Sequence, residues 1–184
     1  MSIFNIFTKK NNDDTKYHAT AKVLINTGCD VDESKLYVKD KNLNLTEEEF
    51  SEFHRCKRDL ACKTVLYTAL ISMKLNKRNK FIEIFMGRKK EKDNLDNAPP
   101  EVREMILKMN EITDEAYHEV FSQITNDLKN TPEPLGIPVD KLMESFCWLF
   151  CSALGKEEDR TYIEIGQHIF NRNHKRALRL LDDL

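Results

Sequence analysis

The five prolines of this chain all fall between Pro99 and Pro138. Proline lacks a backbone N–H and clashes with the preceding turn of a helix, so it is confined to helix starts and to turns. The 98 residues before Pro99 and the 46 residues after Pro138 are therefore free to form long helices. This distribution predicts an all-α protein, a bundle of about six or seven helices.

The length and composition of the chain favour a single domain. Its 184 residues suffice for one substantial core. Hydrophobic residues make up 40%, which is too many for a disordered chain. The longest strongly apolar run, Ser145–Leu154, is about half as long as a membrane span. We predict one helical domain over residues 13–184, preceded by an amphipathic segment over residues 1–12.

The first residues and the cysteines both bear on the location of the protein. Apolar residues precede the lysines in Ile3–Lys10, which is the reverse of a secretory signal. The five cysteines contain no Cys-x-x-Cys pair and fit reduced thiols, so we predict a cytoplasmic protein. Residues 3–10 could also contact an anionic membrane surface. Docking onto the core or a partner subunit is the stronger interpretation, because so short a helix is marginal alone.

The sharpest local signal is Thr46–Glu49. Threonine followed three residues later by glutamate is a capping box, which predicts that a helix starts at Thr46. Apolar residues at helical spacing continue to Met73. Asn76–Asn79 interrupts this pattern, which then resumes until Gly87. The second part is either a separate short helix or a bent continuation of the first.

Further helices are expected in the second half of the chain. One should begin at Pro99-Pro100 and another after Thr113 or Asp114. A later helix contains Trp148, and Gly155 is placed to follow its last turn.

The last predicted helix runs from about Arg160 to Leu181. A small residue on its apolar stripe, Gly166, would let a neighbouring helix approach closely. Residues 17–45 are the least regular part of the pattern. A helix ended by Gly28 is favoured there, with short strands at Lys22–Ile25 and Lys35–Val38 as the alternative.

Charge is unevenly distributed along the chain. Residues 74–92 carry eight Lys or Arg and two Glu, whereas residues 93–159 carry fifteen acids and five bases. Such segregation favours a charged binding face, or two segments that pair with each other. Without a catalytic motif, we predict a non-enzymatic binding or regulatory protein that needs no cofactor, with self-association into oligomers as an open alternative. It would present its acidic helices to a basic partner protein through Glu104, Glu111, Glu115 and Glu119.

A metal-dependent helical-bundle enzyme is the first alternative. Glu115-x-x-His118 places a carboxylate and an imidazole on one helix face, as in carboxylate-bridged dimetal bundles. Glu164 and His168, one turn apart, could add two further ligands. No second Glu-x-x-His pair exists in the chain, so a solvated pair is the stronger interpretation.

Nucleic-acid binding through the C-terminal basic helix is the second alternative. Arg172, Lys175, Arg176 and Arg179 have the spacing of one helix face, and phosphate binding needs such a cluster. A solvated face predicts the same residues, and the isoelectric point of about 6.2 is low for a nucleic-acid binder. We therefore assign Arg172, Arg176 and Arg179 to partner binding in general.

The cysteines fall into two groups. Cys147 and Cys151 lie one turn apart in an apolar run and are expected in the core. Cys56 lies between Arg55 and Lys57, so cationic neighbours predict a depressed pKa and a reactive thiol.

Overall fold

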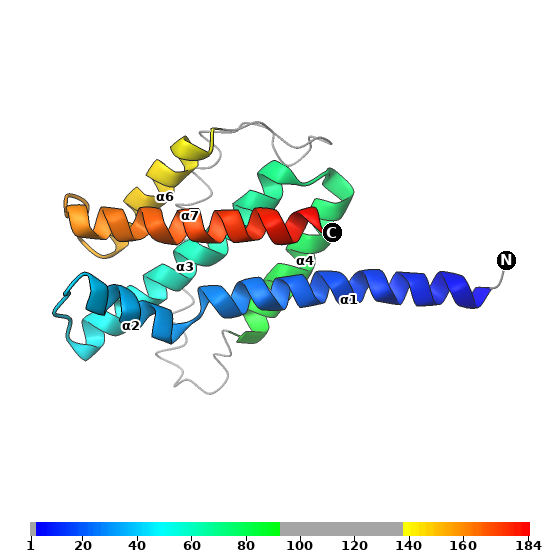
Figure 1. Ribbon diagram of the computed structural model, residues 1–184, viewed down its shortest axis with the longest axis horizontal. Helices are drawn as coiled ribbons and strands as arrows, with labels where there is room; N and C mark the ends of the chain where they lie inside the picture. The colour runs from blue at the N-terminus through cyan, green and yellow to red at the C-terminus, as the bar shows by residue number, and fades with distance from the viewer. Residues whose placement is uncertain (1–2, 93–137) are drawn as a thin grey trace.

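The computed structural model describes the backbone of residues 3–92 and 138–184, and the side chains of residues 14–87 and 138–184 (Figure 1). Every regular element in these ranges is a helix, which confirms the all-α bundle. In the same ranges, no helix has both the length and the apolar character needed to cross a membrane. The helices are α1 (Ile3–Gly28), α2 (Val31–Asp40), α3 (Glu47–Ser72), α4 (Leu75–Lys92), α6 (Val139–Ala153) and α7 (Arg160–Asp182).

Helix α3 is the centre of the bundle and contacts all five other described helices. It begins at the predicted capping box. The Thr46 hydroxyl accepts from the Glu49 amide at 3.2 Å, and the Glu49 carboxylate accepts from the Thr46 amide at 2.8 Å. Two of the amide groups that a helix start leaves unpaired are thereby satisfied, which fixes where α3 begins.

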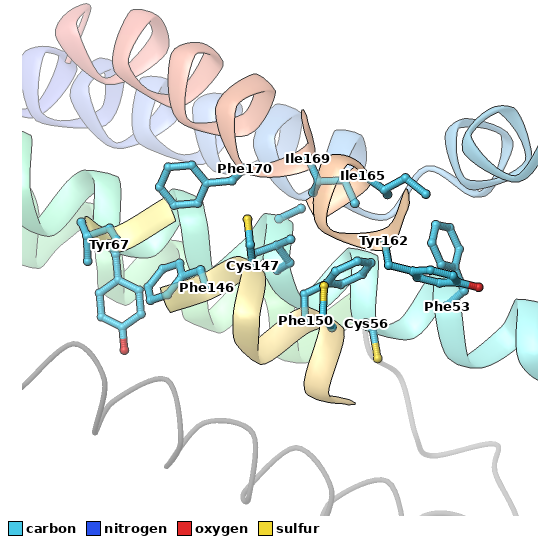
Figure 2. Close-up of a cluster of buried hydrophobic side chains, with 14 of the residues drawn as sticks. Phe53, Cys56, Tyr67, Phe146, Cys147, Phe150, Tyr162, Ile165, Ile169 and Phe170 are labelled. Atoms are coloured by element: carbon cyan, nitrogen blue, oxygen red, sulfur yellow. The ribbon is translucent and has the colours of Figure 1, made fainter. Parts of the chain in front are cut away.

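Two apolar clusters hold the helices together. The first joins α3, α6 and α7 through edge-on aromatic rings, including Phe53, Phe146 and Phe170 (Figure 2). The second joins α1, α3 and α4 to the end of α7, with Phe81 and Leu181 among its members. Burying one such side chain stabilises the fold by about 1.5–3 kcal/mol. Because α3 packs against all the other described helices, most of its side chains after Phe53 are buried.

The region that was least regular in sequence forms two helices. The predicted helix ending at Gly28 is confirmed, and the alternative of strands at Lys22–Ile25 and Lys35–Val38 is wrong. Helical spacing prevails because it places the apolar residues of α1 on one buried face. That face consists of Tyr17, Ala21, Leu24 and Ile25.

Helix α2 begins after Asp30, whose carboxylate accepts from the Asp32 amide at 3.0 Å and from the Glu33 amide at 3.4 Å. Helix α1 runs without a break through residue 12, so the predicted boundary between residues 1–12 and 13–184 falls inside one helix. That division of the chain stays a prediction.

A separate helix follows α3, as one of the two alternatives predicted. Met73 has an extended backbone, with φ −105° and ψ 146°, and it ends α3. Helix α4 starts at Leu75, so Asn76–Asn79 belongs to its first turns and does not interrupt it. The apolar pattern ends at Gly87, and the helix itself continues through the basic run to Lys92.

The connection between α6 and α7 agrees with the sequence. Gly155 follows α6 with φ +62°, a conformation that favours glycine. Its amide donates to the Ser152 carbonyl at 3.0 Å, and the Lys156 amide donates to the Cys151 carbonyl at 2.9 Å. These two bonds form a Schellman motif and satisfy the last carbonyl groups of α6.

Helix α7 matches the predicted span. Gly166 allows close packing, because a Cβ atom there would lie 3.1 Å from Cδ1 of Phe150 and 3.4 Å from Sγ of Cys147. The helices predicted from Pro99-Pro100 and after Thr113 or Asp114 lie outside the described residues.

Candidate functional site

The basic residues predicted on one face of the last helix have different environments. All four lie on α7, but Arg172 is bonded to the Glu33 carboxylate of α2. Arg176 is half-buried, and its Nη1 atom is shielded from solvent. Lys175 and Arg179 are exposed. Helix packing therefore divides this stretch into a paired part around Arg172 and an exposed part that ends at Arg179.

Arg179 borders a hollow that is lined by residues from the end of α7 and from the connection between α3 and α4. These two segments lie close together in the bundle (Figure 1). The hollow has a volume of about 490 Å³. It brings together cations from the two basic stretches of the sequence, with apolar side chains between them. We call it the basic hollow, and it is lined by Ser72, Met73, Lys74, Lys77, Leu178, Arg179, Leu181 and Asp182.

The turn after α3 explains why Lys74 and Lys77 lie beside α7. The extended backbone of Met73 redirects the chain, and α4 starts two residues later. Arg78 supports this corner from inside, because its fully buried side chain donates to the Leu70 carbonyl at 3.1 Å. A cation at the C-terminal end of a helix satisfies open carbonyl groups and complements the helix dipole.

The charges of the basic hollow are not neutralised by the helices around it. Within the described ranges, Lys74, Lys77 and Arg179 form no ion pair, and Asp182 is the single acid of the lining. Lys74, Lys77 and Arg179 are all exposed. The hollow therefore offers three cations to solvent over a partly apolar floor.

A buried ion network ties α2, α3 and α7 together. Lys57 is fully buried, and its Nζ atom lies 2.7 Å from Oε2 of Glu33 and 2.8 Å from the Asp30 carbonyl. The other oxygen of Glu33 binds Arg172. Glu33 and Lys57 were not among the site residues predicted from the sequence. Lys57 lies four residues after Phe53 and three before Leu60, so its place on an apolar stripe was the available signal.

The metal candidates are only partly described. Glu115 and His118 lie outside the described residues. Glu164 accepts from Lys41 at 2.9 Å and from Arg160 at 3.2 Å, and these bonds lower the pKa of its carboxyl group. The His168 ring contacts Tyr37 edge-on, with 5.6 Å between ring centres. In the part of the chain that the structure describes, no three His, Cys, Asp or Glu side chains are grouped to hold a metal ion.

The depressed pKa expected for Cys56 is wrong. Its side chain is buried, and this desolvation raises the pKa of the thiol to about 12 despite the opposing charge of Arg55. Arg55 does donate to the Cys56 sulfur at 3.4 Å, but its charge is already paired with Glu52 at 2.6 Å, and Lys57 binds Glu33. Thiolates need exposed, electropositive surroundings, which this position lacks.

The expected core position of Cys147 and Cys151 is confirmed. Both thiols are buried, and burial raises their pKa values to about 12 and about 11 respectively. The acidic residues predicted for partner binding, Glu104, Glu111, Glu115 and Glu119, lie outside the described residues, as do the side chains of residues 3–10.

Comparisons of the chain with protein-family models, with curated proteins and with solved structures found no match. Inferences about function therefore start from the geometry of the described residues, and the basic hollow groups three exposed cations among them.

Proposed function

We propose that the chain is a non-enzymatic, cytoplasmic binding protein that holds an acidic segment of another protein in the basic hollow. The observation that carries this proposal is the convergence of Lys74 and Lys77 from α4 with Arg179 from α7 around one concavity. Complementary charge steers association and selects partners, so three cations without an ion partner among the described residues favour an acidic partner.

The floor of the basic hollow favours a protein over a simple anion. Met73 and Leu181 are buried beneath the cations, and Leu178 has 39% of its surface exposed beside them. A volume of about 490 Å³ admits an apolar side chain of a partner. Interfaces commonly combine one such anchor with a charged rim. An amphipathic helix with acidic residues around an apolar anchor fits this description.

Nucleic-acid binding is the second candidate, and the same convergence of cations favours it. Phosphate contacts require clustered Lys and Arg on one surface, which Lys74, Lys77 and Arg179 supply. The apolar floor and Asp182 contribute nothing to phosphate binding. The net charge of −2 also argues against a dominant nucleic-acid role. We therefore rank this function below protein binding.

A charge-reversal experiment tests the proposal. The full chain is used as bait in lysate, and bound proteins are quantified by mass spectrometry for wild type and for a Lys74→Glu, Lys77→Glu, Arg179→Glu variant. The matched control reverses three exposed lysines on other helices, Lys22, Lys39 and Lys141, and so makes the same change in net charge. Circular dichroism checks that both variants fold.

Three outcomes of this experiment are informative. A protein that is retained by wild type and control but lost by the hollow variant supports the proposal. Partners that all bind the hollow variant unchanged, or no specific partner even at low salt, would contradict it. Retention that disappears after nuclease treatment, together with salt-sensitive binding to heparin, would favour the nucleic-acid function instead.

A further inference from the structure

A second pocket lies between α2 and α7, and its residues are separate from those of the basic hollow. Its volume is about 260 Å³, and Arg172, Tyr37, His168 and Lys41 are part of its lining. Pockets for drug-sized ligands usually measure about 300–1,000 Å³, so this one suits a small molecule or a single functional group.

The ion network beneath this pocket has more positive than negative charge. Glu33 is the one carboxylate between two cations, with Lys57 on one oxygen and Arg172 on the other. Lys57 is fully buried and occupied by Glu33 and the Asp30 carbonyl. The surplus charge therefore resides on Arg172, whose side chain is 43% exposed and borders the pocket.

The hydroxyl group of Tyr37 lies beside the charge of Arg172. The Tyr37 hydroxyl lies next to Glu33 and Arg172, is shielded from solvent, and makes no hydrogen bond of normal geometry to any described residue. Burial, with a contribution from Glu33, raises the pKa of this hydroxyl to about 12, so it keeps its proton at neutral pH. The acceptor beside it, the Glu33 carboxylate, already binds Lys57 and Arg172, so an incoming anion would offer this hydroxyl a further acceptor.

The other charged groups that line the pocket are either paired or exposed to water. Glu164 is bonded to Lys41 and Arg160, so its charge is already compensated. Asp40 borders the pocket from the end of α2 and is exposed to water. The donors without a full set of acceptors are therefore concentrated at Arg172 and Tyr37, above the apolar side chain of Ile165.

From this arrangement we infer that the pocket between α2 and α7 binds the carboxylate or phosphate group of a small molecule through Arg172 and the Tyr37 hydroxyl. The guanidinium group supplies charge and paired N–H donors, and the hydroxyl supplies a third donor. This binding site is independent of the protein-binding role of the basic hollow.

Titration of the full, ¹⁵N-labelled chain tests the inference. Inorganic phosphate and acetate are added separately at constant ionic strength, with sodium chloride as the reference salt. We expect saturable NMR shifts at the amides of Tyr37 and His168 and at Nε–H of Arg172. Saturation with phosphate alone would identify a phosphate group as the ligand, and saturation with acetate alone would identify a carboxylate. Saturation with both would support a general oxyanion site.

Variants show whether these shifts report the pocket. Tyr37→Phe keeps the ring and should weaken binding about tenfold, the usual effect of losing a hydrogen bond to a charged group. Arg172→Gln should abolish saturation, whereas Arg179→Gln, on the same helix but in the basic hollow, should leave it unchanged. Absence of saturable shifts for either anion, or identical affinities for wild type and Tyr37→Phe, would overturn the inference.

Discussion

Arg172 and Arg179 lie two turns apart on α7, yet their surroundings differ completely. Arg172 binds the buried carboxylate of Glu33, whereas Arg179 borders the basic hollow and has no ion partner within the described ranges. Helical spacing places the two side chains in similar directions. The helix packed alongside each one decides whether the arginine is anchored to a buried carboxylate or lies at the surface without an ion partner among the described residues.

The energetic contrast between the two regions is large. Lys57 has no exposed surface, so its charge would be costly without Glu33 beside it. Removing one member of a buried pair leaves the other charge without compensation in a poorly polarisable environment. Removing an exposed charge leaves no uncompensated buried charge, because water and salt already screen it.

Glu33→Gln should therefore produce the largest effect among the changes considered. It leaves the fully buried ammonium group of Lys57 without a carboxylate, which should lower the free energy of unfolding by about 3–5 kcal/mol. Urea unfolding followed by circular dichroism measures this loss.

The matched control replaces the pair instead of breaking it. The double variant Glu33→Leu, Lys57→Met should recover most of the lost stability, because well-packed apolar residues often replace a buried ion pair without net cost. A loss below about 1 kcal/mol for Glu33→Gln would contradict the contrast, since Lys57 would then behave like a solvated charge.

The stability of the protein should also depend on pH, through a histidine on α7. His174 lies on α7 between the two arginines, is buried, and its Nδ1 atom lies 2.8 Å from the Thr68 hydroxyl. Burial lowers the pKa of His174, so the folded protein keeps this ring neutral where the unfolded chain binds a proton. The unfolded state then binds more protons, and stability should fall as the pH drops below about 6.5.

Urea midpoints measured between pH 8 and pH 5 test this dependence. His54 has a lowered pKa for the same main reason, so the slope of stability against pH should decrease in His174→Gln without disappearing. Arg179→Gln should keep the wild-type slope, because it changes an exposed charge only. An unchanged slope in His174→Gln would show that this histidine does not contribute.

Local signals in the sequence were sufficient for much of the fold. The cap at Thr46 and the glycine after α6 each depend on a few neighbouring residues, and the structure confirms both. The span of α7 followed from the periodicity of its apolar stripe. Such features are readable because their physical cause lies within one or two helical turns.

Features that depend on partners distant in sequence could not be predicted. Cys56 has cationic neighbours along the chain, but Arg55 beside its sulfur is paired with Glu52, Lys57 binds Glu33 of α2, and helix packing buries the thiol. The basic hollow joins segments about a hundred residues apart. Its basic residues were recognised as two stretches, whereas their convergence required the turn at Met73.

The smallest effect on stability is expected for Arg179→Gln, and it is the most direct test of the contrast between the two arginines. Because Arg179 is exposed and lacks an ion partner among the described residues, its loss should change the free energy of unfolding by no more than about 0.5 kcal/mol. The same variant should bind less of any partner captured by the basic hollow. Stability falling by more than about 1 kcal/mol would mean that Arg179 supports the fold, as Arg172 does, and the division of α7 into a paired and an available part would fail.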